Sequence, residues 1–130
     1  MVYTNISKHE ILDIKNEHDL QVHVVQYLKE TDLNFTCTLG GYLDDDYQRI
    51  NATKEGYQKG VCDLIIFSPN KNYKGLGIEL KTPSYGNGKV SKAQIEFLDK
   101  LEIESGYFCF ISNNYTEIIE VIIKYIHNVL

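Results

Sequence analysis

The sequence predicts an α/β domain whose elements follow the order α-β-β-β-α-β-α. Short apolar runs at about 62–68 and 76–81, joined by a segment rich in turn residues, are typical of a strand hairpin. Apolar residues spaced three to four positions apart at about 16–30 and 91–104 are typical of helices. A chain of 130 residues can bury one hydrophobic core, so we expect a single domain over residues 1–130.

The first helix is expected over residues 16–30, with Asn16 as its N-cap. Residues 8–15 either extend this helix or form a short turn before it. A strand is expected over 34–39, where a Gly-Gly pair ends it. The apolar positions of the helix recur at helical spacing and are Leu20, Val24, Tyr27 and Leu28.

Residues 42–59 are polar and irregular, so they predict a long loop, and long loops in small domains often carry function. This loop contains three consecutive aspartates, 44–46, which lack the spacing and glycine of an EF-hand and are expected to form a solvated turn.

The second half of the chain is expected to form a helix, a strand and a final helix. A glycine-rich loop over 82–89 leads to a helix over 91–104, with Gly106 just beyond its end. A strand over 107–112 follows, and a helix rich in isoleucine begins at about Thr116.

The hairpin places three charged side chains on one face. Because side chains alternate along a strand, Glu79 and Lys81 point the same way, while Leu80 points into the core. A hairpin centred near Lys71 puts Asp63 directly across from Glu79. Two neighbouring carboxylates repel each other, and one lysine supplies only one positive charge. A divalent metal ion at the end of the hairpin would offset this repulsion, and an exposed cross-strand ion pair is the alternative that the residues alone favour.

These residues belong to four segments whose order and spacing resemble the VRR-NUC branch (virus-type replication-repair nucleases) of the PD-(D/E)XK nuclease superfamily. The resemblance is strongest over residues 14–112. Cys62 departs from the family pattern, which more often has a proline or a small residue before the aspartate. That position shapes the entry to the strand and is not a ligand. The four segments are 17–21, 56–64, 79–81 and 91–94.

The resemblance implies a restriction endonuclease-like core, a small mixed β-sheet flanked by helices, with the site on its central hairpin. It also implies a Mg²⁺- or Mn²⁺-dependent DNA nuclease that hydrolyses phosphodiester bonds. Asp63 and Glu79 would bind the principal metal, with the Leu80 backbone carbonyl as a further ligand. Lys81 would orient or help deprotonate the attacking water and stabilise the charge that develops on the phosphate.

Two further site residues each have an alternative structural role. Glu17 would bind a second ion or a metal-bound water, or would only complement the dipole of the helix. Glu10 replaces it as the helix carboxylate if that helix begins earlier. Gln94 would complete a capping box with Ser91. The resemblance implies that Gln94 also approaches the active site, where it would bind a metal-bound water or Lys81.

The candidate nucleic-acid contacts are basic residues near the motifs. Lys89 and Lys92 flank a helix start, where backbone N–H groups favour a phosphate. Lys59 and Tyr57 are weaker candidates, and solvated lysines are the alternative. The net charge of −5 is unevenly spread, since residues 49–100 carry nine Lys and Arg against five Asp and Glu. Overall acidity argues against tight non-specific coating of DNA, and a single Arg (Arg49) leaves little for reading bases.

The expected activity is that of a structure-selective endonuclease, of Holliday-junction-resolvase or flap type, acting as a homodimer on branched or duplex DNA. The alternatives are a general or restriction-type endonuclease, or a non-catalytic DNA- or partner-binding domain that keeps the fold. The four histidines form no metal-ligand pattern, and no apolar run is long enough for a membrane span. We therefore expect an intracellular protein without a membrane partner. Its three cysteines are expected to be buried free thiols, and they are Cys37, Cys62 and Cys109.

Overall fold

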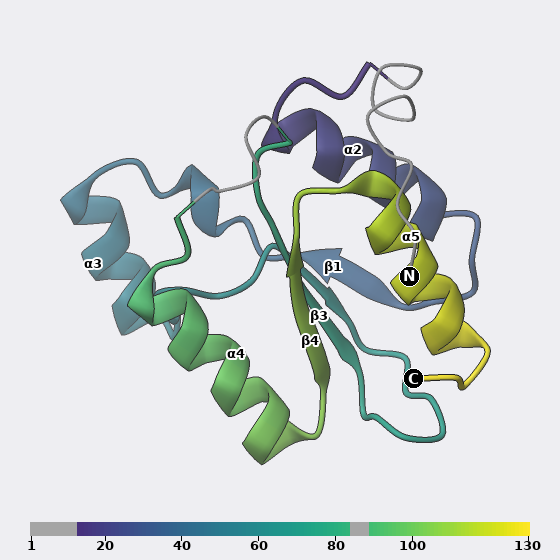
Figure 1. Cartoon of the computed structure of the whole chain (residues 1–130). Helices are drawn as coiled ribbons and strands as arrows, with labels where there is room; N and C mark the ends of the chain where they lie inside the picture. Colours follow the sequence, from purple (N-terminus) through teal and green to yellow (C-terminus); the bar gives the residue numbers. More distant parts are fainter. Residues whose placement is uncertain (1–12, 84–88) are drawn as a thin grey trace.

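The computed structural model of the chain describes residues 13–83 and 89–130 (Figure 1). A four-stranded sheet carries helices on both faces, and the predicted order α-β-β-β-α-β-α is confirmed for these elements. None of the described helices is long and apolar enough to cross a membrane. The elements are α2 (Glu17–Leu28), β1 (Phe35–Cys37), η1 (Gly40–Tyr42), α3 (Asp46–Lys54), β2 (Leu64–Ile66), β3 (Leu76–Leu80), α4 (Lys92–Ser105), β4 (Phe108–Ser112) and α5 (Tyr115–Ile126).

The sheet is mixed and has the strand order β1-β2-β3-β4. β1 with β2, and β2 with β3, pair antiparallel, whereas β3 and β4 pair parallel. Leu64 pairs with Ile78, and continuing this register by one residue brings Asp63 opposite Glu79. The predicted hairpin register is therefore confirmed, and it sets the geometry of the charged end of the hairpin.

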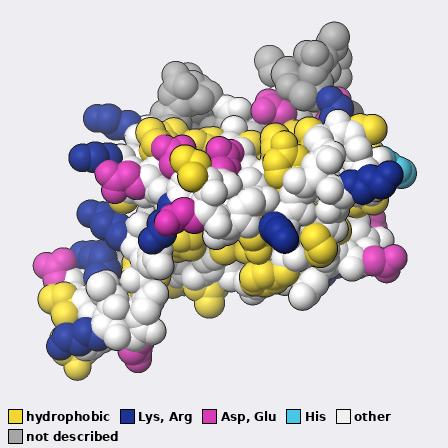
Figure 2. All heavy atoms as spheres, turned by 90° about the horizontal axis from the view of Figure 1, so that it is seen from below, with side chains coloured by type: hydrophobic (Ala, Val, Ile, Leu, Met, Phe, Trp, Pro, Cys, Tyr) yellow, Lys and Arg dark blue, Asp and Glu magenta, His cyan; other side chains and the backbone are white. Residues whose placement is uncertain are grey.

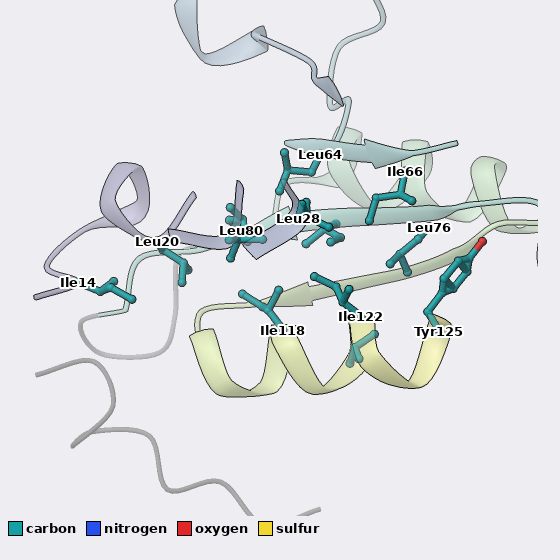
Figure 3. Close-up of a cluster of buried hydrophobic side chains, with 13 residues drawn as sticks. Ile14, Leu20, Leu28, Leu64, Ile66, Leu76, Leu80, Ile118, Ile122 and Tyr125 are labelled. Carbon is teal, nitrogen blue, oxygen red and sulfur yellow. The ribbon is translucent and has the colours of Figure 1, made fainter. Parts of the chain in front are cut away.

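α2 and α5 cover one face of the sheet and bury an apolar core between them (Figure 3). Asn16 caps α2, since its Oδ1 accepts a hydrogen bond of 2.8 Å from the Asp19 N–H, as the sequence predicts. The turn before it is not helical, so α2 begins at Glu17; Glu10 lies outside the described residues. The core side chains labelled in Figure 3 are Ile14, Leu20, Leu28, Leu64, Ile66, Leu76, Leu80, Ile118, Ile122 and Tyr125.

α4 covers the opposite face of the sheet and lies very close to β3. A Cβ built on Gly77 would lie 2.9 Å from Leu101 Cδ2 and 3.1 Å from Cys109 Sγ, so a larger residue here would require these two side chains to move. All three cysteines are free, as predicted, but only Cys62 is fully buried, while Cys37 and Cys109 are half-buried. Because side chains alternate along β3, the residues two and four positions after Gly77 also face α4.

The predicted loop over 42–59 is wrong, because this segment forms α3 and part of η1. The aspartates at 44–46 are solvent-exposed, as predicted, but they lead into a helix, since Asp45 is the N-cap of α3 and accepts a hydrogen bond of 2.7 Å from the Gln48 N–H. α3 buries none of its side chains, so it lacks the apolar periodicity that would reveal a helix. In Figure 1 it projects from the sheet as an arm between β1 and β2. We call residues 39–59 the β1–β2 arm.

Candidate active site

Two carboxylates meet at the end of the β2–β3 hairpin. Asp63 Oδ2 accepts a hydrogen bond of 2.7 Å from the Leu80 N–H, which extends the pairing of the two strands just before β2 begins. Asp63 is half-buried and lies opposite Glu79, which is 3% exposed, so the charges of the two carboxylates act on each other. The pair therefore sits where water is scarce and where two full negative charges would repel each other.

Burial is the main reason why both carboxyl groups hold protons more tightly than usual. Loss of solvent raises the pKa of Glu79 to about 8, and the negative charge of Asp63 raises it further, while Lys81 acts to lower it. Burial also raises the pKa of Asp63, against the lowering effects of the Leu80 N–H, Glu79 and Lys81. In the metal-free protein at neutral pH, the pair thus keeps a proton that a cation would displace.

Lys81, Glu79 and Gln94 form a closed network above this pair. Lys81 Nζ lies 3.4 Å from Glu79 Oε2 and donates a hydrogen bond of 3.0 Å to Gln94 Oε1. Gln94 Nε2 in turn donates a hydrogen bond of 3.0 Å to Glu79 Oε2. Each of the three side chains therefore fixes the other two, and the Lys81 ammonium is held in place by partners at known positions.

Gln94 fills both roles that the sequence left open. It completes a capping box, because the Ser91 N–H donates to Gln94 Oε1 at 3.0 Å and the Gln94 N–H donates to Ser91 Oγ at 3.1 Å. The same amide also bridges Lys81 and Glu79. Because α4 starts beside the hairpin, the Gln94 side chain can cap the N-terminus of this helix and also hold Lys81 and Glu79 in place.

Gly60 allows the chain to pass against the start of α4. Its φ of +87° is a left-handed conformation that favours glycine, and a Cβ here would lie 2.3 Å from the Ala93 carbonyl carbon. This explains the glycine that precedes the acidic strand in the sequence. The close approach keeps Gln94 within reach of Glu79.

A pocket of about 350 Å³ opens over the network and gathers most of the predicted site. Glu17 reaches it from the first turn of α2, where partial loss of solvent raises its pKa, as does the charge of Asp63, while Lys81 lowers it. Asn16 caps this helix, and Glu17 is one of two acidic residues in its first turn, where it also complements the helix dipole. The predicted site residues that line this pocket are Glu17, Tyr57, Lys59, Asp63, Glu79, Lys81 and Gln94.

The structure does not bring Lys89 and Lys92 into this pocket. Both side chains are exposed, and Lys92 Nζ lies 3.7 Å from Glu96 Oε1. Lys89 contributes its backbone carbonyl, which accepts a hydrogen bond of 3.4 Å from Lys81 Nζ. Phosphate contacts by these two lysines stay predictions.

Thr38 is a pocket residue that the sequence analysis missed. Its N–H donates to the Asp63 carbonyl at 3.1 Å, and its Oγ1 donates to the Cys62 carbonyl at 2.6 Å, so it braces the backbone that carries Asp63. A hydroxyl residue at a strand end, just before the Gly40-Gly41 pair, was the available signal. Both glycines also line the pocket.

The donor set suits a hard divalent cation that keeps several waters. Asp63 and Glu79 supply carboxylate oxygens, and the Leu80 carbonyl faces the same strand edge as the N–H that binds Asp63. Across residues 13–83 and 89–130, no group of three or more His, Cys, Asp or Glu side chains is close enough to hold a metal ion. Two carboxylates with water completing the shell is the coordination that Mg²⁺ accepts in proteins.

The fold and this constellation together define a restriction endonuclease-like nuclease domain. The chain belongs to the VRR-NUC domain family, whose model matches residues 5–111. A solved structure described as a VRR_NUC domain protein is similar to this chain at 25% sequence identity, with a TM-score of 0.69. The match covers 85% of this chain and 88% of that one. The comparison with curated proteins gives no match.

Proposed function

We propose that this domain is a Mg²⁺- or Mn²⁺-dependent DNA nuclease that hydrolyses phosphodiester bonds. The observation that supports this most is the Asp63–Glu79 pair beside Lys81, where burial raises the pKa of both carboxyl groups although they line an open pocket. Buried carboxylates that repel each other cost stability and contribute nothing to the core. A role in holding a cation accounts for their position.

Each residue of the site has a definite task in this proposal. Asp63, Glu79 and the Leu80 carbonyl would hold the ion, which supplies charge neutralisation on the phosphate and a water that loses its proton near neutral pH. Lys81 orients the attacking water and stabilises negative charge on the phosphate. Gln94 positions Lys81 and Glu79 through its two hydrogen bonds. Glu17, on the opposite wall, would bind a second ion or a metal-bound water.

The surroundings of the pocket favour a DNA strand as substrate. Lys59 and Tyr57 line it on the side of the β1–β2 arm and would contact the strand beside the scissile phosphate. Figure 2 shows several Lys and Arg side chains along the left edge of the molecule, which is the end where α3 lies in Figure 1. Positive charge near the pocket would draw the phosphate backbone toward an otherwise acidic protein.

We further propose that the enzyme is a structure-selective endonuclease, of junction-resolving or flap type, which works as a homodimer. The chain has one Arg, so recognition of DNA shape and backbone is favoured over base reading. Two copies would place two sites on a branched or duplex substrate. A general or restriction-type endonuclease is the alternative within the same chemistry.

The test is cleavage of labelled single-stranded, duplex, flap and four-way-junction DNA with Mg²⁺, Mn²⁺ or EDTA. Glu79→Gln removes the ligand charge while keeping the size of the side chain, and we expect it to lower the cleavage rate at least about 100-fold. Glu96→Gln is the matched control, because Glu96 is an exposed carboxylate on α4 that does not line the pocket. We expect Glu96→Gln to cut like the wild type.

Two outcomes would contradict the proposal. If the wild-type protein cuts none of these substrates with either metal, the domain is a binding module that kept the fold. If Glu79→Gln cuts as well as Glu96→Gln, then the activity does not come from this site. A preference for the flap or the junction over plain duplex would support structure selectivity.

A further inference from the structure

A second cavity of about 260 Å³ opens beside the active-site pocket. The two cavities share Glu17, Gly40, Gly41 and Asp63, so a ligand in one can continue into the other. Of the two glycines that line both cavities, Gly41 has open space at its Cβ position, whereas a Cβ on Gly40 would lie 3.0 Å from the Tyr57 hydroxyl. The remaining walls of the second cavity are His18, Gln21, Cys37, Leu39 and Tyr42.

The chemistry of the second cavity differs from that of the first. The active-site pocket includes Lys59 and Lys81, whereas no described Lys or Arg lines the second cavity. A phosphate there would face the carboxylates of Glu17 and Asp63 without a compensating positive charge. A neutral ring with hydrogen-bonding edges fits these walls better than an anion does.

The polar groups of this cavity are available for a ligand. Within the described residues, the side chains of His18 and Gln21 make no hydrogen bond. Both belong to the first turns of α2, on the side that faces the β1–β2 arm across the cavity. An imidazole and a carboxamide supply both donors and acceptors, which suit the edge of a nucleobase.

The apolar wall is exposed and partly strained. Tyr42 is 68% exposed and Leu39 is 60% exposed, although both are large apolar side chains next to the proposed catalytic centre. Leu39 has a φ of 60°, a left-handed conformation that strains a residue with a Cβ. Strained residues that present a side chain beside a functional site are typical of ligand contacts.

We propose that this cavity holds an unpaired nucleobase of the DNA strand that is cut, stacked on Tyr42, while the neighbouring phosphate occupies the active-site pocket. The proposal rests on the proposed function and names its substrate class: DNA with an unpaired nucleotide beside the scissile phosphate. In a regular duplex, that base would first have to leave the stack, which is unfavourable. Branched and single-stranded substrates avoid this cost.

The test combines a change in the DNA with a change in the protein. Single-stranded and flap substrates are made with one abasic nucleotide at each position beside the scissile phosphate. For wild type, we expect removal of one particular base to weaken binding roughly 5- to 100-fold, the range of base stacking on an aromatic side chain. In Tyr42→Ala, the normal substrate should bind that much more weakly and the abasic penalty should disappear.

The matched control is Tyr47→Ala. Tyr47 is a tyrosine of the same arm, 76% exposed, and it lines neither cavity. We expect Tyr47→Ala to keep the full abasic penalty. If the penalty is absent in wild type, or persists unchanged in Tyr42→Ala, the base subsite is wrong.

Binding is read by fluorescence anisotropy with Ca²⁺ in place of Mg²⁺, and cleavage is read separately with Mg²⁺. The two readouts separate the failures of the two proposals. A Tyr42-dependent penalty in a protein that never cuts would support the subsite and overturn the nuclease. Cleavage with no penalty at any position would overturn the subsite and leave the nuclease standing.

Discussion

The two faces of β3 differ sharply in what they bury. Toward α2 and α5, the strand presents Leu76, Ile78 and Leu80, all fully buried in an apolar core. Toward α4, it presents Gly77 and Glu79, and the buried Lys81 follows directly after the strand. One face is closed by dispersion and the hydrophobic effect, and the other by hydrogen bonds among charged groups.

The difference shows how so small a domain can support a costly site. Burial of a carboxylate is unfavourable, and it raises the pKa of Glu79 to about 8. The apolar face must supply the stability that the charged face lacks. Mutations on the two faces should therefore separate folding from function, and we order them by their expected effect on the free energy of unfolding.

The largest loss is expected on the apolar face, at Ile122 of α5. Ile122 is fully buried against the sheet (Figure 3), so Ile122→Ala leaves a cavity and should lower the free energy of unfolding by about 2–5 kcal/mol. Urea unfolding measures this change. The fraction that stays folded should keep its cleavage rate, since the charged face is untouched. A large loss of activity per folded molecule would mean that the two faces are coupled.

Gly60→Ala changes the backbone that supports the charged face. It should lower the free energy of unfolding by about 2–4 kcal/mol. The added Cβ collides with the backbone of Ala93 and must also accept a left-handed φ, so the start of α4 has to move. Because Gln94 moves with it, cleavage per folded molecule should also fall. Gly56→Ala is the control, since Gly56 has a φ of +109° but open space around its Cβ position. Equal losses of stability in the two variants would show that the left-handed φ causes the loss and that the collision with Ala93 does not.

Most of the charged face could be predicted from the sequence because it depends on local rules. Strand alternation places Glu79 and Lys81 on one side, the turn fixes the register of Asp63, and the Ser91-x-x-Gln94 spacing predicts the cap. Each of these relations involves residues close in the chain. The structure bears out all of these placements.

The β1–β2 arm could not be predicted in the same way. α3 buries no side chain, so its sequence has no apolar periodicity. Its N-cap, Asp45, stands in a run of three aspartates, and nothing in the sequence distinguishes it from its neighbours. The second cavity is lined by Tyr42 of this arm together with Gln21 of α2. Contacts between segments this far apart follow from packing and leave no local pattern in the sequence.

Most substitutions of buried residues destabilise a protein, but Glu79→Gln should stabilise the metal-free protein by about 1–3 kcal/mol above pH 8. The pKa of Glu79 is raised from 4.5 when unfolded to about 8 when folded, so between these values the folded state binds more protons. The free energy of unfolding of the wild type in EDTA should therefore fall as pH rises from about 5 to 8. In Glu79→Gln this decrease should largely vanish. Thermal unfolding over this pH range measures both slopes, and a wild-type stability that rises with pH would contradict the raised pKa.

The smallest effect on stability is expected at the rim of the charged face, where two lysines differ in their surroundings. Lys59 lines the active-site pocket, whereas Lys92 is exposed and paired with Glu96 at 3.7 Å, an interaction worth no more than about 0.5 kcal/mol. Neither Lys59→Ala nor Lys92→Ala should change unfolding measurably. Lys59→Ala should lower the slope of log Kd against log salt by about 0.7–0.9, the value of one phosphate contact. Lys92→Ala should lower it less, because Glu96 already neutralises that charge. A larger decrease in Lys92→Ala than in Lys59→Ala would indicate that the DNA runs past the start of α4 and not past the arm. It would support the phosphate contact that the sequence predicts for Lys92.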